Sequence, residues 1–315
     1  MIEFLPVIIL VFSFLVLLTL GVPVAWCIAM SSMFTLMVAM PFSAATTTVS
    51  QRIGTGLDSF ALLAIPFFIL SGQIMSSGGI AHRLISFAKT LVGFLPGGLA
   101  LINIVSAMMM GAIAGSAMAS ASAMGTILGP EMEKEGYSKE FGAAVNITSS
   151  TTGLVIPPSN TLIVYSLASG GVSIAALFLA GYIPGILTGL FMMIVAIFWA
   201  KKHKYPVGKR SSLKEVFVKF VDAVPSLLLL VIVIGGIIGG VFTATEASAV
   251  AVLYTLLLSF YYKELSLKDL PKVILESTET TAIVMLLIGA SMCMSWVLSY
   301  ENIPQDISNF LLSVS

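Results

Sequence analysis

The stretch GAAVNITSSTTGLVIPPSNTLIVYS, residues 142–166, decides the fold of this chain. It begins and ends as apolar helix, but its middle holds the small and polar run Thr148–Gly153 and the pair Pro157-Pro158. Neither proline can donate a backbone hydrogen bond, and each disfavours the helical turn before it. Unpaired backbone groups are costly in lipid, so non-helical backbone survives there only inside protein or around a polar cavity. A membrane helix broken in this way is typical of a solute or ion site in a transporter.

The composition places the chain in a membrane. Of its 315 residues, 58% are hydrophobic and only 10% are charged, which is outside the range of soluble globular domains. We therefore predict an all-α polytopic membrane protein with about eight to ten apolar segments. Cys27 and Cys293 lie in apolar runs and are interpreted as small core residues rather than as a disulfide. The first apolar run lacks the pattern of a cleavable signal peptide, so we predict that it is a span.

The apolar segments can be placed along the chain by their hydropathy. Residues 43–58 are too polar to span and are expected along the interface, and residues 80–92 continue the preceding span as an amphipathic piece. The segments expected to enter the membrane are 5–20, 24–40, 60–75, 97–114, 117–132, 141–168, 174–200, 224–239, 241–262 and 280–298.

Basic residues orient these segments, because cytoplasmic loops of membrane proteins are enriched in Lys and Arg. The stretch Lys201–Lys219 holds seven of the fifteen Lys and Arg residues, so it is expected in the cytoplasm. Counting spans from there places only Arg52 outside, and it places the N-terminus on the periplasmic face.

The chain also repeats itself. Residues 5–76 and 224–299 share one order: a proline-led apolar helix, a glycine turn, a second apolar helix, a more polar piece and another span. The copies are offset by about 220 residues and begin on opposite sides, as in the inverted repeats of transporters. The alternative is ordinary helical hairpins in series. The second copy has no counterpart of residues 97–200, so we expect that the chain is truncated or is part of a larger whole, with half of the transport site outside it.

This repeat suggests a division of the chain. The predicted parts are a first-repeat scaffold hairpin and interfacial arm (1–59), a first-repeat transport region (60–200) with a re-entrant hairpin (about 97–132) and a broken helix (about 141–168), a cytoplasmic basic linker (201–223), a second-repeat scaffold hairpin and arm (224–279), and the start of an incomplete second transport region (280–315).

Gly115-Ser116 joins two apolar arms, and each arm is short for a full span. If both arms enter from the inner face, they form a re-entrant hairpin whose small-residue tip packs against the broken helix. The alternative is two full spans with a small-residue packing face. Gly129-Pro130 and the charged residues after it favour the hairpin, because they end the second arm on the cytoplasmic side.

The hairpin tip and the helix break together predict a site for Na⁺ and an anion. A hard cation takes oxygen ligands, from hydroxyls and from carbonyls that the prolines release. The candidate Na⁺ ligands are Ser116, Ser149, Ser150, Thr151, Thr152, Gly153 and Pro157. The helix start after Pro158 offers N–H groups to an anion. The candidate substrate-binding residues are Ser120, Ser159, Asn160 and Thr161. The alternative for several of these hydroxyls is helix capping alone.

Other functions find little support in the residues. Glu246 follows Thr243 at capping-box spacing, which favours a helix cap over an intramembrane functional carboxylate. No triad, phosphate loop or metal-spaced His and Cys cluster appears in the apolar runs, so we predict neither an enzyme nor an organic cofactor. A nucleic-acid role has no basic aromatic surface to support it.

Several segments resemble the large membrane subunit of tripartite ATP-independent periplasmic (TRAP) transporters. They are FALLAIPFFILSGQIMSSGGI (60–80), LVGFLPGGLA (91–100), AGSAMASASAMGTILGPEM (114–132), IPPSN (156–160), FLAGYIPGIL (178–187) and GGVFTATEASAVAVLY (239–254). The resemblance implies a Na⁺-coupled secondary transporter of the bacterial inner membrane, with an elevator fold of scaffold and moving transport domain. It also implies two partners, a small four-helix membrane subunit and a periplasmic substrate-binding protein, and organic-acid substrates such as C4-dicarboxylates and sialic acids.

This chain departs from the family pattern in two ways. Members often read SGSAVAD at the hairpin tip, so Ala114 stands for their first serine, Ser120 stands for their aspartate, and Ser116 alone transfers. Members also continue for about a hundred further residues, in agreement with the repeat. The remaining alternatives are a passive channel, a proton-coupled carrier, which the scarcity of buried carboxylates disfavours, and a non-transporting structural subunit if the chain ends at Ser315.

Overall fold

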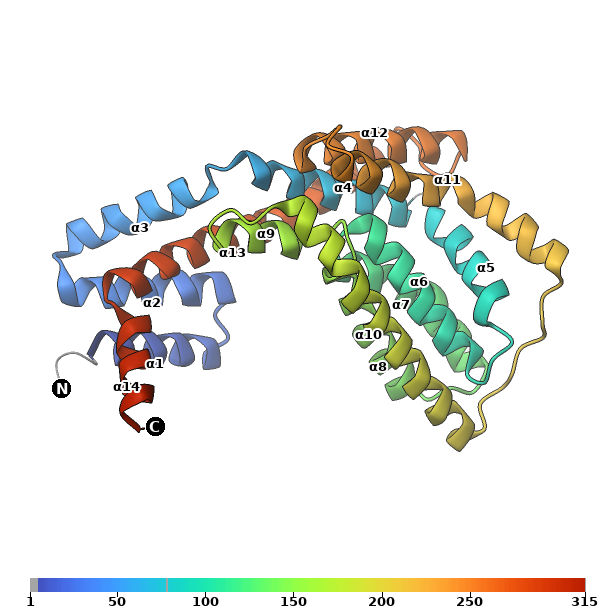
Figure 1. Cartoon of the computed structure of the whole chain (residues 1–315), viewed down its shortest axis with the longest axis horizontal. Coiled ribbons are helices and arrows are strands. Elements are labelled where there is room, and N and C mark those ends of the chain that lie inside the picture. Colours follow the sequence, from blue (N-terminus) through green and yellow to red (C-terminus); the bar gives the residue numbers. More distant parts are fainter. Residues whose placement is uncertain (1–4, 78, 315) are drawn as a thin grey trace. The chain divides into compact units, whose positions relative to one another are not determined.

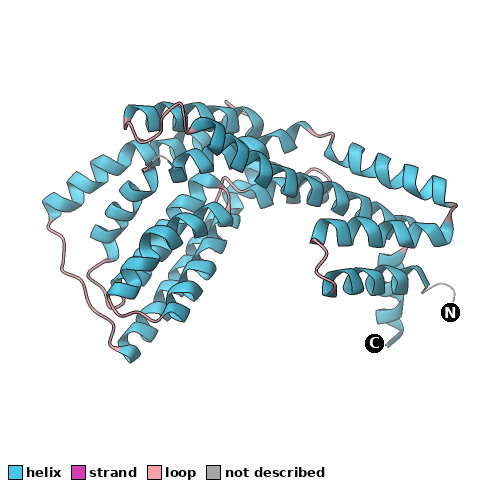
Figure 2. Cartoon of the chain, turned by 180° about the vertical axis from the view of Figure 1, so that it is seen from behind, coloured by secondary structure: helices cyan, strands magenta, loops and turns pink. Residues whose placement is uncertain are grey.

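The computed structural model describes residues 5–77 and 79–314, and within them all regular secondary structure is helical (Figures 1 and 2). Within the described residues, Pro96 and Val207 form an isolated antiparallel β-bridge. The helices are α1 (Leu5–Thr19), α2 (Val24–Ala39), α3 (Phe42–Leu57), η1 (Phe60–Leu63), α4 (Ala64–Ser77), α5 (Ile80–Val92), α6 (Gly98–Ala114), α7 (Ala117–Lys134), α8 (Lys139–Ser150), η2 (Thr151–Leu154), α9 (Asn160–Ala168), α10 (Ile174–His203), α11 (Leu213–Ile238), α12 (Ala244–Tyr261), α13 (Leu270–Tyr300) and α14 (Ile303–Val314). The predicted all-α membrane fold is confirmed.

Among the described residues, four helices are long and apolar enough to cross a membrane: α10, α11, α12 and α13. A fifth crossing is possible if α3 and residues 60–76 together form one broken span. The helices α1, α2 and α6 are apolar but shorter. The chain is therefore a multi-pass membrane protein.

The described residues form two compact units. One is drawn from Met1–Ser59 and Glu279–Ser315, and its core gathers Leu36, Ala45, Val49, Cys293 and Val297. Both cysteines are buried, as the interpretation of them as small core residues expects. The Arg52 guanidinium lies 4.4 Å from the centre of the Trp296 ring in the same unit.

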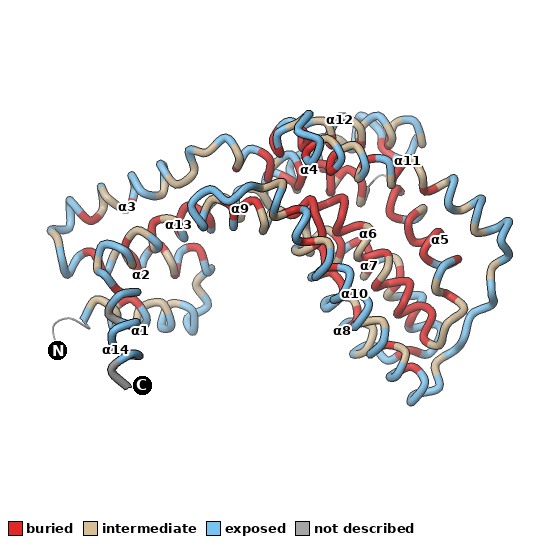
Figure 3. The backbone as a smooth tube through the Cα atoms, viewed as in Figure 1, coloured by how far each residue is buried: buried red, intermediate tan, exposed pale blue. Residues whose placement is uncertain are grey.

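The second unit is Phe60–Thr278 and holds the candidate site. Its centre is α6, which packs against α4, α5, α7, α8 and α10. Buried residues run along almost the whole of α6 and along one face of α5 (Figure 3). A helix buried on all sides needs no polar face, which agrees with the apolar sequence of α6.

Two helices extend further than the sequence suggested. The predicted linker 201–223 is mostly helical, because α10 continues to His203 and α11 already begins at Leu213, which leaves residues 204–212 as the connection. The Ser212 hydroxyl accepts a hydrogen bond from the Glu215 N–H (3.2 Å) and so caps α11. The basic residues of this stretch lie on helix ends that extend past the apolar segments. Similarly, α13 is one continuous helix, where the sequence suggested an interfacial piece and a separate span.

Candidate functional site

The predicted helix break is present. The helix α8 ends at Ser150, one 3₁₀ turn (η2) follows, and residues 155–159 have no regular structure before α9 begins at Asn160. The Pro157-Pro158 peptide bond is cis, and both prolines are buried. Since neither proline has a backbone N–H, the carbonyls of the preceding turn lose their helical partners here. We call residues 151–159 the break.

The tip between α6 and α7 lies against this break. Gly115 takes the left-handed conformation (φ +59°) that reverses the chain, and the Asn160 N–H donates to its carbonyl (3.4 Å). A Cβ on Gly153 would lie 2.9 Å from the Gly111 Cα, so the two backbones touch. A Cβ on Gly115 would lie 2.7 Å from the Pro158 carbonyl oxygen. Small residues thus allow the close approach that the sequence predicted.

A row of glycines on α10 covers the other side of the break. A Cβ on Gly181 would lie 2.5 Å from the Val155 carbonyl oxygen, Gly185 faces Ile156, and Gly189 faces Met108. These glycines recur every fourth residue in GYIPGILTG, which places them on one helix face. Sequence reasoning missed their role, although this spacing was the available signal.

Most candidate hydroxyls are engaged in local hydrogen bonds. Ser116 caps α7 by accepting from the Ala119 N–H (3.4 Å), and Ser159 caps α9 by accepting from the Leu162 N–H (3.3 Å). Ser120 is buried and donates to the Ala107 carbonyl (3.2 Å), so it ties α7 to α6. Thr161 is exposed at the start of α9.

The hydroxyls of α8 and η2 donate to carbonyls one turn earlier. Ser150 donates to Asn146 (2.7 Å), Thr151 to Thr148 (2.7 Å) and Thr152 to Ser149 (2.6 Å). A donating hydroxyl keeps lone pairs on its oxygen, so these bonds are compatible with cation binding. Thr152 and Gly153 are buried beside the tip, whereas Thr151 is exposed. The structure therefore brings Gly153 against Ser116, with Thr152 beside Gly111, buries Pro157 in the break, and leaves Thr151 and Thr161 exposed.

Three asparagines, Asn103, Asn146 and Asn160, belong to this site. Sequence reasoning singled out only Asn160. The Asn160 Oδ1 atom is buried and has no hydrogen-bond partner among the described residues. The Ser149 hydroxyl donates to the Asn103 Oδ1 (3.1 Å), and the Asn146 Nδ2 donates to the Ala121 carbonyl (2.9 Å). The signal for Asn103 was a lone amide inside an apolar membrane helix, which is a functional hypothesis by default.

A pocket of about 330 Å³ reaches Asn103 and Asn146 between α7 and α8. Asn103 and Asn146 form one part of its lining, and the ion-paired Glu133 and Lys139 (3.5 Å) form another. Ser149 connects Asn103 to the helix that enters the break. The pocket therefore extends from charged residues at the turn between α7 and α8 toward the break.

The site is neutral and rich in oxygen. Its candidates include no charged side chain, and the described residues hold no cluster of three His, Cys, Asp or Glu side chains able to bind a metal. The donor set of hydroxyl, amide and carbonyl oxygens suits a hard monovalent or divalent cation. Glu246 lies elsewhere and completes a capping box, since the Thr243 N–H donates to its Oε2 (2.8 Å), as the capping prediction expects.

The chain matches one family of transport proteins and several of its members. The family model described as "Tripartite ATP-independent periplasmic transporter, DctM component" matches residues 11–315. The chain is 53% identical over 310 residues to "Uncharacterized protein YgiK" of Salmonella typhimurium, which covers 98% of this chain and 71% of that protein.

Two further relatives carry functional names. "C4-dicarboxylate TRAP transporter large permease protein DctM" of Rhodobacter capsulatus is 36% identical over 280 residues, covering 84% of this chain and 64% of that protein. "Sialic acid TRAP transporter large permease protein SiaM" of Vibrio cholerae is 36% identical over 311 residues, covering 97% of this chain and 71% of that protein. The chain thus spans 64 to 71% of the length of these three relatives.

Proposed function

Because the chain belongs to the DctM family of tripartite ATP-independent periplasmic transporters, we propose that it works in Na⁺-coupled import of organic acids by an elevator mechanism. The chain is a TRAP large permease, which is a transport protein and not an enzyme. The Na⁺ coupling, the elevator movement, the substrate and the partners are the proposal.

The observation that supports Na⁺ binding most directly is the break seated on the hairpin tip. The backbone leaves the helical path there after one 3₁₀ turn, and the buried Asn160 Oδ1 lacks a partner among the described residues. A buried acceptor without a partner is unfavourable by about 1–3 kcal/mol. A bound cation would remove that cost, and the proposed further oxygens come from Ser116, Thr152, Gly153 and Pro157.

The substrate proposal rests on the start of α9. Two of its first-turn N–H groups are engaged, by the Gly115 carbonyl and by the Ser159 hydroxyl, and the partial positive charge of the helix start favours an anion beside the break. Relatives are named for C4-dicarboxylate, sialic acid and 2,3-diketo-L-gulonate, which are all organic acids. We therefore propose an organic acid of this kind, with Asn160 and Ser159 beside its carboxylate and Ser120 holding the tip in shape.

The energetics are adequate for uphill import. Each Na⁺ that enters with the membrane potential contributes about 2.3 kcal/mol per 100 mV. Two or more ions would offset the charge of a carboxylate and still drive accumulation. The proposed partners are a small four-helix membrane subunit and a periplasmic substrate-binding protein. The proposed location is the bacterial inner membrane, with the N-terminus in the periplasm and the basic linker in the cytoplasm.

Transport by the complete permease, reconstituted with both partners in liposomes, tests this proposal. We expect uptake of a radiolabelled organic acid that depends on an inward Na⁺ gradient and exceeds equilibrium. Ser116→Ala is expected to raise the Na⁺ concentration needed for half-maximal uptake, whereas the control Ser169→Ala, at the far end of α9, is not.

Three outcomes would contradict the proposal. Uptake that is unchanged without Na⁺ excludes Na⁺ coupling. Uptake abolished by a protonophore in Na⁺-free buffer indicates a proton-coupled carrier. Flux that only follows the substrate gradient and needs no binding protein indicates a channel.

A further inference from the structure

A second pocket of about 490 Å³ lies far along α6 from the tip, at the N-terminal end of that helix. Residues of α5, the first turn of α6 and the connection 204–212 line it, and its volume is in the range of ligand sites, which is about 300–1,000 Å³. We call it the basic pocket. Its charged lining residues are Lys89, Glu135, Lys209, Arg210, Glu215 and Lys219.

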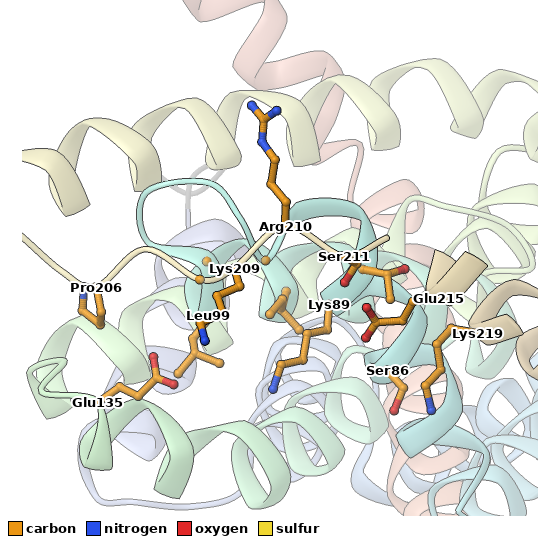
Figure 4. A pocket seen from close by; sticks show the side chains of 15 residues that line it. Ser86, Lys89, Leu99, Glu135, Pro206, Lys209, Arg210, Ser211, Glu215 and Lys219 are labelled. Carbon is orange, nitrogen blue, oxygen red and sulfur yellow. The ribbon is translucent and has the colours of Figure 1, made fainter. Parts of the chain in front are cut away.

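Three lysines from different elements line the basic pocket. Lys89 comes from α5, Lys209 from the connection and Lys219 from α11, and Figure 4 shows Arg210 pointing away from them. The Arg210 guanidinium instead lies 5.2 Å from the centre of the Phe94 ring. The lysines therefore supply the positive charge of the pocket itself.

These lysines are not neutralised within the part of the chain that the structure describes. The ion pairs there involve Arg83, Lys139 and Lys272, and none includes Lys89, Lys209 or Lys219. Glu135 and Glu215 line the pocket but lie beyond ion-pairing distance of the three lysines. In addition, the N-terminus of α6 lies at the pocket, since its first residues Gly98 and Leu99 are part of the lining and its N-cap residue Gly97 has no side chain. The start of a helix adds to the positive potential.

A cluster of aromatic residues lies beside the basic pocket. Tyr205, directly before the lining residue Pro206, stacks on Tyr137 with ring centres 4.3 Å apart. Trp199 stacks on His203 at 4.4 Å and on Phe141 at 5.9 Å, so an aromatic cluster closes this end of α10. Trp and Tyr concentrate where membrane helices reach the lipid headgroups.

We propose that the basic pocket binds a phosphate group, and that its position beside the aromatic cluster favours an anionic phospholipid headgroup over free phosphate as the source. Lys89, Lys209 and Lys219 contact the phosphate, while the hydroxyls of Ser86 and Ser211 are available to donate hydrogen bonds. Basic pockets beside membrane helices bind anionic headgroups by this chemistry. The lipid would join α5, α6 and the connection to α11. This inference goes beyond the proposed transport function and does not depend on it.

Native mass spectrometry of the purified full chain, titrated with phosphatidylglycerol or with phosphatidylcholine, tests the proposal. We expect retention of phosphatidylglycerol in preference to phosphatidylcholine. The double variant K89Q/K219Q is expected to weaken phosphatidylglycerol binding about 30-fold, since each lysine near an anionic headgroup contributes about fivefold. Glu215→Gln should strengthen binding, because it removes a negative charge from the lining.

The matched control is K201Q/K202Q, which removes the same charge at the exposed end of α10 outside the lining. It should leave the affinity unchanged, and circular dichroism should show that all variants remain helical. Equal weakening by both double variants, or no preference for phosphatidylglycerol, would overturn the proposal. A parallel titration with inorganic phosphate separates the sources: saturable phosphate binding that K89Q/K219Q weakens, without retention of phosphatidylglycerol, keeps the phosphate site but rejects the lipid.

Discussion

Asn160 combines two roles within one residue. Its backbone N–H holds the break on the hairpin tip through the Gly115 carbonyl, while its Oδ1 is buried without a partner among the described residues. The backbone bond survives any substitution that keeps α9, so the side chain can be tested separately from the fold. An unpaired buried acceptor is a cost in the empty site that is removed when a cation binds.

The first prediction follows from this separation. Asn160→Ala should leave the thermal unfolding midpoint without Na⁺ unchanged or slightly raised, because it removes the unpaired acceptor. The stabilisation that Na⁺ adds should fall, with the apparent Na⁺ dissociation constant raised about tenfold for a loss of about 1.4 kcal/mol. Asn160→Asp, which keeps an oxygen at this position, should retain the Na⁺ effect. Melting curves in NaCl and in choline chloride measure all three proteins, and equal Na⁺ shifts in wild type and Asn160→Ala would exclude Oδ1 as a ligand.

The second prediction concerns the glycine contact between α6 and the break. A methyl group on Gly111 would collide with the Gly153 backbone, which cannot move without displacing the break. Gly111→Ala should therefore destabilise the protein by about 1–3 kcal/mol, as overpacking does. The control is Gly235→Ala in α11, where a Cβ meets nothing within 4 Å and alanine should stabilise the helix by about 1 kcal/mol. Chemical denaturation in detergent measures both, and a neutral Gly111→Ala would mean that the tip and the break separate easily.

At the scale of elements, Arg83 connects the first turns of α5 to neighbouring parts of the chain. Arg83 on α5 pairs with Asp222 on α11 and with Glu264 after α12 (3.3 Å), and its guanidinium lies 3.6 Å from the centre of the Tyr262 ring. Only 22% of the Arg83 side chain is exposed, so this group is less screened than an ordinary surface pair. Charge pairing and stacking together need the planar guanidinium.

The third prediction tests the ion pairs and the ring contact of Arg83. Arg83→Lys should destabilise the protein by about 1–2 kcal/mol, because lysine keeps the charge but loses the forked geometry and the stacking. The comparison is Lys272→Gln on α13, whose pair with Glu276 (3.9 Å) is exposed and should be worth about 0–0.5 kcal/mol. Denaturation at low and high salt measures both. An Arg83→Lys protein as stable as the wild type would show that charge alone suffices.

The elements also show what the sequence could predict. The Pro157-Pro158 pair and Gly115 act locally, through a missing N–H and a left-handed turn, and both positions were correctly identified as a break and a tip. The start of α11 was misplaced because Lys214 and Lys219 indicated a loop, although Ser212 is an N-cap. The continuity of α13 was missed because polar residues 276–280 suggested an interruption that packing does not require. The roles of Asn103 and Asn146 depend on partners far away in sequence, which one chain without its fold cannot reveal.

For the whole molecule, the two units divide the chain near residues 59 and 279. Each predicted repeat contributes to both units. Of the first repeat, α1–α3 lie in one unit, and η1 and the helices up to α10 lie in the other. Of the second repeat, α11, α12 and the start of α13 lie with η1–α10, and the rest of α13 lies with α1–α3. The five predicted domain roles and the inverted repeat stay predictions. Both predictions imply one orientation of the chain in the membrane, and that orientation is predicted from the positions of the Lys and Arg residues alone.

The fourth prediction tests that orientation across the molecule. The sequence has two cysteines, so a Cys27→Ala and Cys293→Ala background removes both native thiols and their labels. In that background Lys204→Cys, at the exposed end of α10, should react with a membrane-impermeant maleimide only after the inner face is opened, while Gln51→Cys on exposed α3 should react in intact spheroplasts. The reasoning is that Lys204 belongs to the stretch with the highest density of basic residues, and Arg52 beside Gln51 is the one basic residue expected outside. The reverse labelling pattern would contradict the sidedness, and labelling of both residues from one face would contradict the number of spans between them.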